Sequence, residues 1–355
     1  MKLGSFFKAF PVPKYLHFPA VGFDISDDSV RFMELLDSGG KVTVGRYDEV
    51  DYSSGDVVKT LYGIRKKHCF NLVNVSVPEE ESYLVRMHLP YIRLSEIREA
   101  VELHLEEYIP YSGDEVEFSY EILKVVPGPE GHIDLNVGAL PKQIVAKYLD
   151  IFKEAGLEPA ALVIEAEATG RSLVPKQVDG DTVMVVNMGK KGTVLSIISR
   201  GSVWFNYTFG LGGDFLNERL QKTFKISREE AEKIKFGKGL LTNNANQEVF
   251  ECLMPALSSI RDEIDRHRHY WMDHQEELLP QLSDRTISRV ILCGSQSAMP
   301  GITDYLSIAL STRAMLGNPW INIFDLNEYV PPITHKDSLK YATAIGLAEY
   351  SLKLE

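Results

Sequence analysis

The chain has 355 residues, of which 44% are hydrophobic and 25% charged, so we expect a folded globular protein with more than one core. Its formal net charge of -12 repels phosphate backbones, and no basic patch offsets it, which argues against nucleic-acid binding. The 3 cysteines are few, odd in number and far apart, which favours reduced thiols over disulfides or a metal site. No apolar run reaches the roughly 20 residues of a membrane-spanning helix, so we expect a cytoplasmic protein.

Residues 1–20 differ from the rest of the chain in composition. They contain lysines and several aromatic residues but no acidic residue, and their prolines exclude one long helix. A basic and aromatic arm of this kind can contact anionic lipid, or it can pack on its own domain. The sequence leaves both alternatives open, and the second is the more common one.

A unit of three strands occurs twice in the chain. The alternation of apolar runs and turns predicts strands over 21–25, 30–36 and 42–50 in the first copy, and over 182–186, 193–199 and 203–209 in the second. A polar turn follows the first strand of each copy. We interpret the pattern as an internal duplication, which predicts two similar lobes whose turns can face one cleft.

The segment between the two copies has a complete pattern of its own. Apolar residues at helical spacing over 95–108 predict an amphipathic helix. Residues 116–122 and 133–139 alternate between apolar and polar side chains, which predicts two half-buried strands. A second helix is predicted over 144–152. We therefore expect a small inserted subdomain over residues 78–155.

The second half of the chain is predicted to be mainly helical. Asp214 can cap a helix that extends to about residue 223, and Ser227 with Glu230 forms a capping box for the next helix. A long amphipathic helix is predicted over 248–274. The expected organisation is an arm at 1–20, a first lobe at 21–77 and 156–181, an inserted subdomain at 78–155, a second lobe at 182–213 and 286–338, a helical subdomain at 214–285 and a terminal helix at 339–355.

Two strand-to-strand turns are candidate phosphate sites. The turns over 24–29 and 187–193 can point successive backbone N–H groups inward, and such nests bind phosphate oxygens. Either turn alone is far more often only a turn, but their duplication strengthens the functional interpretation.

Two further loops and one helix could join these turns. Gly212 and Gly213 precede a predicted helix, where backbone can approach a ligand closely at a positive helix end. Residues 294–296 follow a strand, which is the usual crevice position in an open α/β sheet. Glu232 and Lys235 lie one helical turn apart and are either a solvated ion pair or a clamp on a nucleoside.

A family resemblance is carried by seven segments in chain order. They are VGFDISDDSVRFMEL, EAVELHLEEYIPYSGDEVEFSYEIL, GLGGDFL, EEAEKIK, SSIRDEIDRHRHYW, LCGSQSAMPG and YATAIGLA. No single segment is specific, but together they resemble the PilM family, the actin-like cytoplasmic proteins of type IV pilus assembly. The resemblance covers nearly the whole chain after about residue 20.

The resemblance implies a fold, a cofactor and a partner. The fold is α/β, namely the two-lobed actin-like ATPase fold of duplicated ribonuclease H-like domains, with a small α+β subdomain inserted in the first lobe. The cofactor is ATP or ADP with Mg²⁺ between the lobes. The partner is a PilN-like inner-membrane protein bound through a short cytoplasmic peptide, which places the chain at the inner face of the membrane. Self-association stays open.

The resemblance also implies site residues. The implied nucleotide-binding residues are Asp24, Ser26, Ser29, Asn187, Gly189, Thr193, Gly212, Gly213, Glu232, Lys235, Gly294, Ser295 and Gln296, and the implied Mg²⁺ ligand is Asp24. Some residues depart from the family pattern. Asp27 and Asp28 repel a polyphosphate unless Mg²⁺ lies between, and the neutral Asn187 stands where the family has a water-holding aspartate. We therefore expect slow hydrolysis or none.

Other functions have weaker support. A sugar-kinase-like phosphotransferase needs a general base aimed at a hydroxyl, and no aspartate has a clear signature for that role. A cell-division filament protein resembling FtsA usually adds a membrane-binding tail, whereas this chain stops at Glu355. His267 and His269 would diverge by about 200° on a helix, so we expect solvated histidines there and no zinc site.

Overall fold

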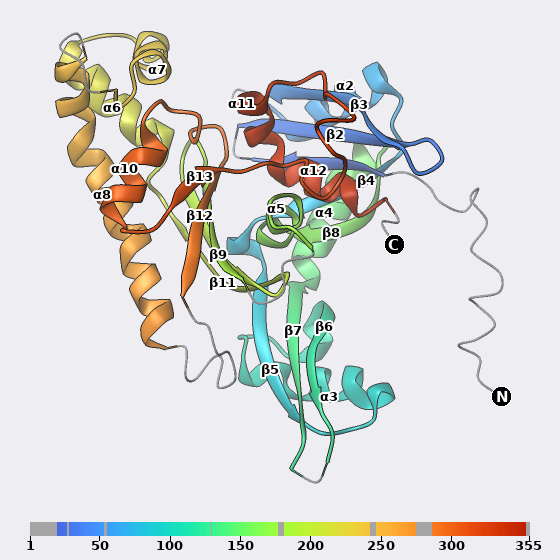
Figure 1. The fold of residues 1–355 in the computed structure, drawn as a ribbon. Coiled ribbons are helices and arrows are strands. Elements are labelled where there is room, and N and C mark those ends of the chain that lie inside the picture. The colour runs from blue at the N-terminus through green and yellow to red at the C-terminus, as the bar shows by residue number, and fades with distance from the viewer. Residues whose placement is uncertain are drawn as a thin grey trace.

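The computed structural model describes residues 20–26, 28–52, 55–128, 130–176, 181–241, 246–274 and 286–352. Except for Ala20, the predicted arm at 1–20 lies outside the described residues, and so does Asp27. The described residues form two five-stranded sheets, one three-stranded sheet and the helices around them (Figure 1).

The two large sheets have the same topology, which confirms the predicted duplication. The first contains β1 (Val21–Ile25), β2 (Ser29–Asp37), β3 (Val42–Asp51), β4 (Leu72–Val77) and β8 (Glu158–Ile164), in the order β3-β2-β1-β4-β8. The second contains β9 (Thr182–Met188), β10 (Thr193–Ser199), β11 (Ser202–Phe209), β12 (Ile287–Cys293) and β13 (Ala314–Leu316), in the order β11-β10-β9-β12-β13. In each sheet the first strand pairs antiparallel with the next strand in sequence and parallel with the strand on its other side.

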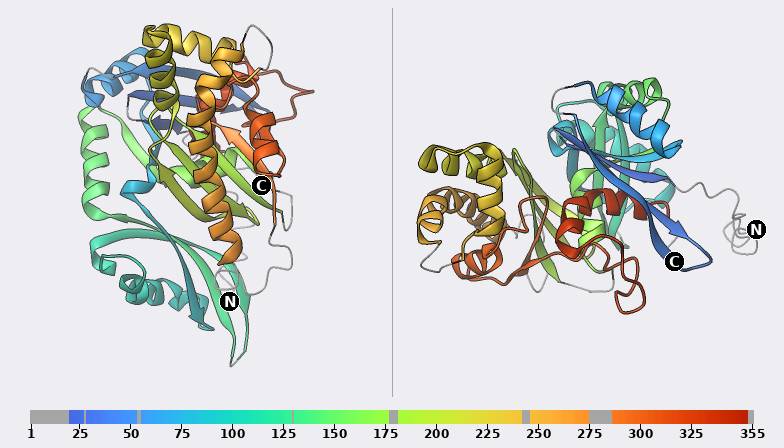
Figure 2. Two further views of the ribbon diagram at one scale, coloured as in Figure 1. Left: turned by 90° about the vertical axis from the view of Figure 1, so that its left-hand side faces the viewer. Right: turned by 90° about the horizontal axis from the view of Figure 1, so that it is seen from above.

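Two helices between the sheets join the lobes. Helix α5 (Glu165–Leu173) follows the first sheet but contributes side chains to a core with the second sheet. Helix α12 (Ala342–Glu349) follows the second sheet but packs on β1, β2 and β4 of the first. The two helices contact each other directly, and the buried hydroxyls of Thr169 and Thr343 lie 2.8 Å apart. The sheet of each lobe therefore packs against a helix that follows the sheet of the other lobe in the chain (Figures 1 and 2).

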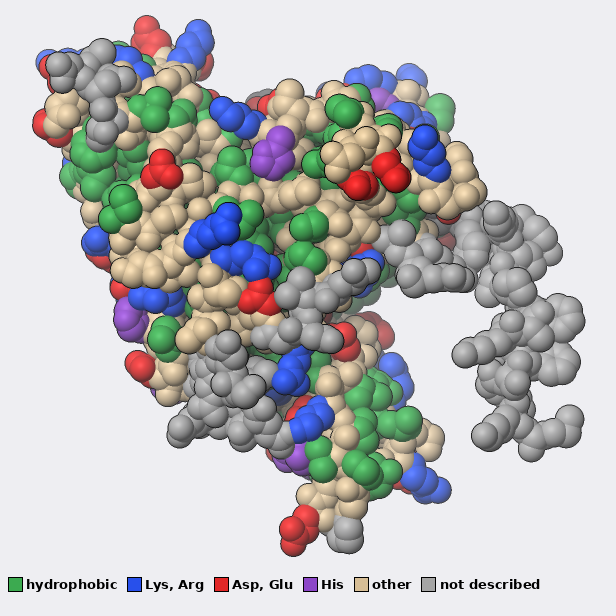
Figure 3. Space-filling view, in the orientation of Figure 1, with side chains coloured by type: hydrophobic (Ala, Val, Ile, Leu, Met, Phe, Trp, Pro, Cys, Tyr) green, Lys and Arg blue, Asp and Glu red, His purple; other side chains and the backbone are tan. Residues whose placement is uncertain are grey.

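The inserted subdomain stands apart from the two lobes (Figure 3), with acidic and basic side chains interspersed on the face shown. Its sheet contains β5 (Tyr83–Pro90), β6 (Val116–Val126) and β7 (His132–Pro141), in the order β5-β7-β6. Helix α3 (Ile97–His104) packs on one face of this sheet, and the two form a separate core. Short 3₁₀ turns over Glu79–Glu81, Leu94–Glu96, Leu105–Glu107 and Gly113–Glu115 connect these elements.

The second predicted helix of the inserted segment belongs to a different core. Helix α4 (Lys142–Glu154) packs against α2 (Val57–His68), and its Tyr148 and Phe152 are buried in the core of the first large sheet. The domain boundaries expected from the sequence stay a prediction, and this packing leads us to propose that the inserted unit ends at Pro141 and not at residue 155.

Helices of the second lobe cover its sheet. They are α6 (Gly213–Phe224), α7 (Arg228–Gly237), α8 (Gln247–Asp273) and α10 (Ile302–Ala309). The short helix α11 (His335–Ser338) contributes no residue to that core, and a 3₁₀ turn over Leu339–Tyr341 leads from it to α12. The capping box of Ser227 and Glu230 is confirmed. The prediction that Asp214 caps this helix is wrong, because α6 begins at Gly213 and its N-cap is Gly212. In the described part of the chain, none of these helices has the length and apolarity that crossing a membrane requires.

The contact between α5 and α12 predicts a strong destabilisation by Gly346→Val. A Cβ at Gly346 would overlap the backbone carbonyl of Ala168 on α5, and backbone cannot move aside as a flexible side chain can. We expect the free energy of unfolding to fall by about 1–3 kcal/mol or more in denaturant titration. The control is Gly63→Ala on α2, where nothing lies within 4 Å of the added Cβ. Equal stability of the two variants would contradict this account of the joint.

Candidate functional site

A cleft between the lobes brings the two duplicated turns together. An inner cavity of about 80 Å³ opens into an outer one of about 640 Å³, and Asp28, Lys190 and Ser295 line both. The floor of the inner cavity includes Glu165 at the start of α5, and Ala342 and Thr343 at the start of α12. The positive ends of two helix dipoles therefore meet the floor of the cleft.

An ion pair spans the two turns where the inner cavity meets the outer one. Lys190 Nζ, in the turn after β9, donates to Asp28 Oδ2, in the turn after β1. The pair links the two lobes across the cleft, and the Asp28 side chain is largely buried. A phosphate group that entered here would compete with Asp28 for the lysine, because both are anionic acceptors.

Buried carboxyl groups lie beneath this ion pair. Asp24 Oδ1 accepts a hydrogen bond from Ser76 Oγ at 3.0 Å, and Asp24 Oδ2 is 3.5 Å from Arg31 Nη1. Burial raises the pKa of Asp24 in spite of that guanidinium. The pKa of Glu165 is raised well above its ordinary value by burial and by the nearby carboxyl groups of Glu79 and Asp24. A cation or a proton bound among these carboxyl groups would relieve the repulsion between their charges.

Asn187 is tied to the same cluster. Its Nδ2 donates to Glu165 Oε1 at 2.8 Å, so the residue that departs from the family pattern is an amide donor to a carboxyl group. An aspartate at this position would have placed a second carboxyl group beside Glu165. The arrangement supplies hydrogen-bond donors to the cleft but no carboxylate in the place where the resemblance implies a water-holding aspartate.

Most of the residues implied by the family resemblance line the cleft. The inner cavity is lined by Asp24, Ser26, Asn187, Gly189, Gly294 and Ser295, and the outer cavity by Ser29, Glu232, Ser295 and Gln296. Arg31, Glu165 and Lys340, which the sequence analysis missed, line the cleft as well. Both residues pair with Glu49: Arg31 Nε lies 2.8 Å from Oε1, and Lys340 Nζ lies 2.5 Å from Oε2.

The remaining four implied residues support the loops and do not line either cavity. The Thr193 hydroxyl donates to the carbonyl of Leu211 at 2.7 Å, and the Gly213 N–H donates to the Gly189 carbonyl at 3.0 Å. Gly212 is the N-cap of α6. Lys235 is fully buried, its Nζ lies 3.4 Å from the Gly213 carbonyl, and burial lowers its pKa to about 8.

Two glycines allow the loops to pack on one another. A Cβ at Gly213 would overlap the side chain of Gln296, and a Cβ at Gly294 would overlap Asn187 and the Met188 carbonyl. Gly294 also has a φ of +87°, which side chains disfavour. The second turn, the Gly212-Gly213 loop and residues 294–296 therefore form one frame, and Gly213 is needed for contact with Gln296.

The cleft has the donor groups that a nucleotide and a hard cation need. The outer cavity falls within the roughly 300–1,000 Å³ range of ligand pockets. Lys190, Arg31 and two helix N-termini supply positive charge, and the Asp24 and Glu165 carboxyl groups supply the oxygen ligands that Mg²⁺ prefers. Asp24 would have to exchange its Arg31 contact for the ion.

The family model described as "Type IV pilus assembly protein PilM" matches residues 22–351, nearly the whole described chain. The chain belongs to this family. The resemblance inferred from the seven sequence segments is thereby confirmed.

Solved structures show the actin-like fold. The PilM of a structure titled "PilM-PilN type IV pilus biogenesis complex" superposes with a TM-score of 0.74 at 19% identity, over 95% of this chain and 99% of that chain. MreB 5 of Spiroplasma citri bound to AMPPNP superposes with a TM-score of 0.53 at 12% identity, over 92% and 94% of the two chains. EutJ of Carboxydothermus hydrogenoformans has a TM-score of 0.52 at 16% identity, over 96% and 91%. At these identities the likeness concerns the fold, and it confirms the predicted fold class.

Curated relatives match only in part. The cell division protein FtsA of Bacillus subtilis (strain 168) is 21% identical over 60% of this chain and 48% of its own length. The ethanolamine utilization protein EutJ of Escherichia coli (strain K12) is 24% identical over 53% of this chain and 53% of its own length. The alignment thus spans about half the length of each of these relatives.

The carboxyl cluster predicts a pH-dependent stability to which Glu79 contributes. Burial raises the pKa of Glu79 from 4.5 to about 7, and its Oε1 accepts from the Ala166 N–H at 2.8 Å, a bond that glutamine can keep. The folded state then holds more protons than the unfolded state between these two pKa values, so stability falls as pH rises through that window. We expect Glu79 to contribute a slope of up to about 1.4 kcal/mol per pH unit and the profile of Glu79→Gln to be flatter by that contribution, while the other carboxyl groups with raised pKa keep theirs. The exposed neighbour change Glu80→Gln is the control, and parallel profiles for wild type and Glu79→Gln would contradict the assignment.

Proposed function

We propose that this chain is a nucleotide-responsive scaffold of type IV pilus assembly. It binds ATP or ADP between its lobes, hydrolyses it slowly or not at all, and docks the cytoplasmic peptide of a PilN-like inner-membrane protein. The observation that carries the proposal is the cleft in which both copies of the duplicated turn meet, in a chain of the PilM family. Its association with the membrane would come through that partner.

The charges of the cleft assign roles to parts of a nucleotide. The phosphates would take Lys190 from Asp28 and meet the N-termini of α5 and α12. Asp24 would hold Mg²⁺, whose charge also offsets the repulsion between Asp28 and a polyphosphate. The nucleoside would occupy the outer cavity, beside Glu232, Phe236 and Gln296.

Hydrolysis needs a group that accepts a proton from water, and the cleft offers a poor one. The amide of Asn187 cannot accept that proton, and the raised pKa of Glu165 favours the protonated carboxyl, which has no base function. Glu165 Oε1 is also engaged with the Asn187 amide. Binding and hydrolysis are thus separable in this chain.

Asn187→Asp should raise the hydrolysis rate of the protein. We expect wild-type turnover below about 1 per second, the lower end of ordinary enzyme rates. The new carboxyl can share a proton with Glu165 and hold a water, and we expect an increase of about 10-fold or more, within the usual range of acid–base effects. Phosphate release under saturating MgATP measures it. Asn187→Ala is the matched control, since it removes the amide without supplying an acid, and equal rates in the two variants would contradict the proposal.

A groove between the inserted subdomain and the first lobe supports the docking of a peptide. A cavity of about 280 Å³ is lined by Phe118 and Ser119 of β6 and by Leu162 and Ile164 of β8. A second cavity of about 300 Å³ adjoins it and shares Ser119, Gly138 and Glu167. Among the described residues β6 is an edge strand, paired with β7 alone. Its free edge can add an extended peptide through main-chain hydrogen bonds.

The chemistry of this groove indicates an apolar peptide with a basic residue. Glu117 and Glu167 line the groove together with apolar side chains. Burial, and then the charge of Glu121, raise the pKa of Glu167 to about 7. A cationic group of the peptide placed beside Glu167 would favour its ionised form and so gain affinity.

Gly138→Val should weaken peptide binding by filling the groove. A Cβ there would lie 3.3 Å from the end of the Ile164 side chain and 4.0 Å from Glu167 Oε1, so the Ile164 side chain has to shift by a few tenths of an ångström to admit it. The measurement is the titration of a synthetic peptide from the cytoplasmic end of a PilN-like protein encoded nearby. We expect an affinity loss of about 10-fold or more, which corresponds to 1.4 kcal/mol.

The control for this titration is Leu103→Ala. Leu103 is 71% exposed on α3, outside both cavities. Deleting residues 78–155 is a less suitable test, because it would remove Tyr148 and Phe152 from the core of the first lobe. Unchanged affinity in a folded Gly138→Val protein would place the partner elsewhere, and residues 1–20 would then be tested first.

A further inference from the structure

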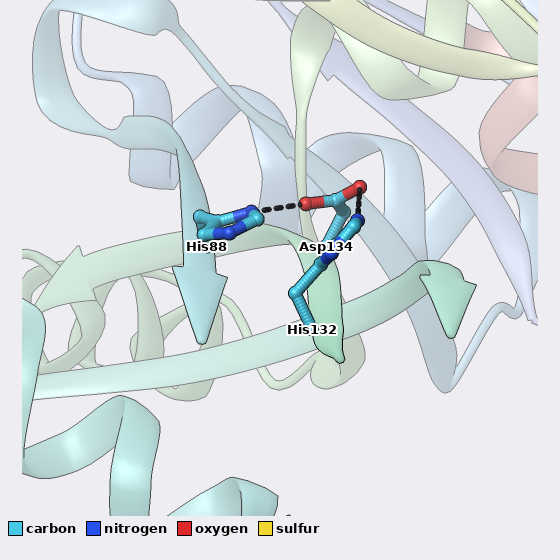
Figure 4. A group of neighbouring side chains, drawn as sticks. All are labelled: His88, His132 and Asp134. Carbon is cyan, nitrogen blue, oxygen red and sulfur yellow. Dashed lines mark hydrogen bonds and ion pairs between the residues drawn. The ribbon is translucent and has the colours of Figure 1, made fainter. Parts of the chain in front are cut away.

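Three potential metal ligands lie together on the sheet of the inserted subdomain. His88 is on β5, and His132 and Asp134 are on β7 (Figure 4). His88 Nδ1 is 2.7 Å from Asp134 Oδ1, and His132 Nε2 is 3.6 Å from Asp134 Oδ2. One ligand atom from each residue lies within 4.8 Å of the other two. This triad is separate from the nucleotide cleft and from the peptide groove, whose linings contain none of the three.

The sheet register brings the triad to one face. His88 and Asp134 are direct cross-strand partners, and His132 precedes Asp134 by two residues, so its side chain lies on the same side of β7. The opposite face carries Met87, Ile133 and Leu135 into the core under α3. The triad is therefore held by a rigid pair of strands whose other face is fixed by packing.

We propose that His88, His132 and Asp134 bind a divalent first-row transition metal ion, with Zn²⁺ as the fitting probe. Two imidazole nitrogens and one carboxylate are typical ligands for zinc, whereas Mg²⁺ and Ca²⁺ prefer oxygen ligands throughout. Three protein ligands leave at least one position for water. The two rings lie next to each other, with centroids 4.6 Å apart, and the Asp134 carboxylate contacts one nitrogen of each ring. A bound ion would take the place of these contacts.

The geometry requires only side-chain rotation. Ligand atoms on a tetrahedral zinc ion lie roughly 3.3 Å apart, given bonds of about 2.0–2.1 Å. The Asp134 carboxylate lies 2.7 Å from His88 Nδ1 and 3.6 Å from His132 Nε2, and one ligand atom of each residue lies within 4.8 Å of the others, so a small rotation suffices. His88, whose side chain is 65% exposed, can turn. Lys124, opposite Asp134 on β6, adds a positive charge nearby, so we expect moderate affinity.

Metal binding would join the end of β5 to β7. Pro90 closes β5 opposite His132, and the chain then leaves the sheet for α3. On the same face Asn136 Nδ2 donates to the Val203 carbonyl of β11, so the triad lies next to the contact between the inserted subdomain and the second lobe. A bound ion would stiffen this end of the subdomain and raise the Tm of the protein.

The test is a zinc titration of the full chain, produced without a histidine tag and stripped with a chelator. Competition against a chromogenic zinc indicator should show one equivalent of binding in the wild type that millimolar Mg²⁺ does not displace. His132→Ala and Asp134→Asn should each lower the affinity by about 10-fold or more, since even residues that only orient metal ligands have effects of that size. Co²⁺ should give the visible absorption of a tetrahedral site in the wild type and not in the triad variants.

The matched control is His104→Ala. His104 is the last residue of α3, pairs with Glu107 of the following 3₁₀ turn and is not one of the three proposed ligands. This variant should bind zinc like the wild type. His88→Gln changes a mostly exposed side chain and keeps the test valid if a change at a more buried ligand prevents folding, which circular dichroism would reveal. Absence of a zinc equivalent in the wild type, or equal affinity in the wild type and the folded triad variants, would overturn the proposal.

Discussion

The crossing of α5 and α12 holds the two lobes together. Each helix leaves one sheet and packs on the other, and the two meet where Gly346 lies against the Ala168 carbonyl and Thr169 meets Thr343. The close approach is possible because small residues occupy both helices at the crossing. It also fixes the cleft, because both helices begin at its floor. Motion of one lobe against the other would have to turn about this joint.

The electrostatics of the cleft follow from that geometry. The joint brings Glu165 under the turn of the second lobe, beside Asp24 of the first, and burial raises the pKa of both carboxyl groups. Lys190 pairs with Asp28 across the gap. A nucleotide with a cation would replace these contacts by stronger ones and would thereby hold the lobes at a defined distance. If the peptide groove changes with that distance, reciprocity requires the peptide to change nucleotide affinity by the same factor.

The sequence predicted the elements that follow from local pattern. The two sets of three strands and the capping box of Ser227 and Glu230 could be predicted because periodicity and capping chemistry are local properties of the sequence. Strand β5 has the same alternation, with Val85, Met87 and Leu89 facing its subdomain's core, and could have been found. The packing of α4 on the first large sheet could not be predicted, because its apolar face could equally have packed on the sheet of the inserted subdomain.

The cleft residues that the sequence missed depend on tertiary contacts. Glu165 lies at the start of a helix without a motif, and only the packing of α5 beneath the second sheet brings it to Asn187. The zinc triad is equally hidden, because His88 and His132 are far apart in sequence and only the register of β5 and β7 joins them. Conversely, Thr193 and Lys235 resemble ligand contacts in the sequence, and the structure uses their side chains to hold loops.

Whether the cleft between the lobes holds a nucleotide can be read from the nucleotide content of the protein. The purified chain would be incubated with millimolar MgATP, separated from free nucleotide and denatured, and the supernatant analysed by mass spectrometry. We expect close to one ATP or ADP per chain, with ATP persisting because hydrolysis is slow. A folded protein that retains no nucleotide, and shows no heat of binding when MgATP is titrated into it, would show that the cleft does not bind one.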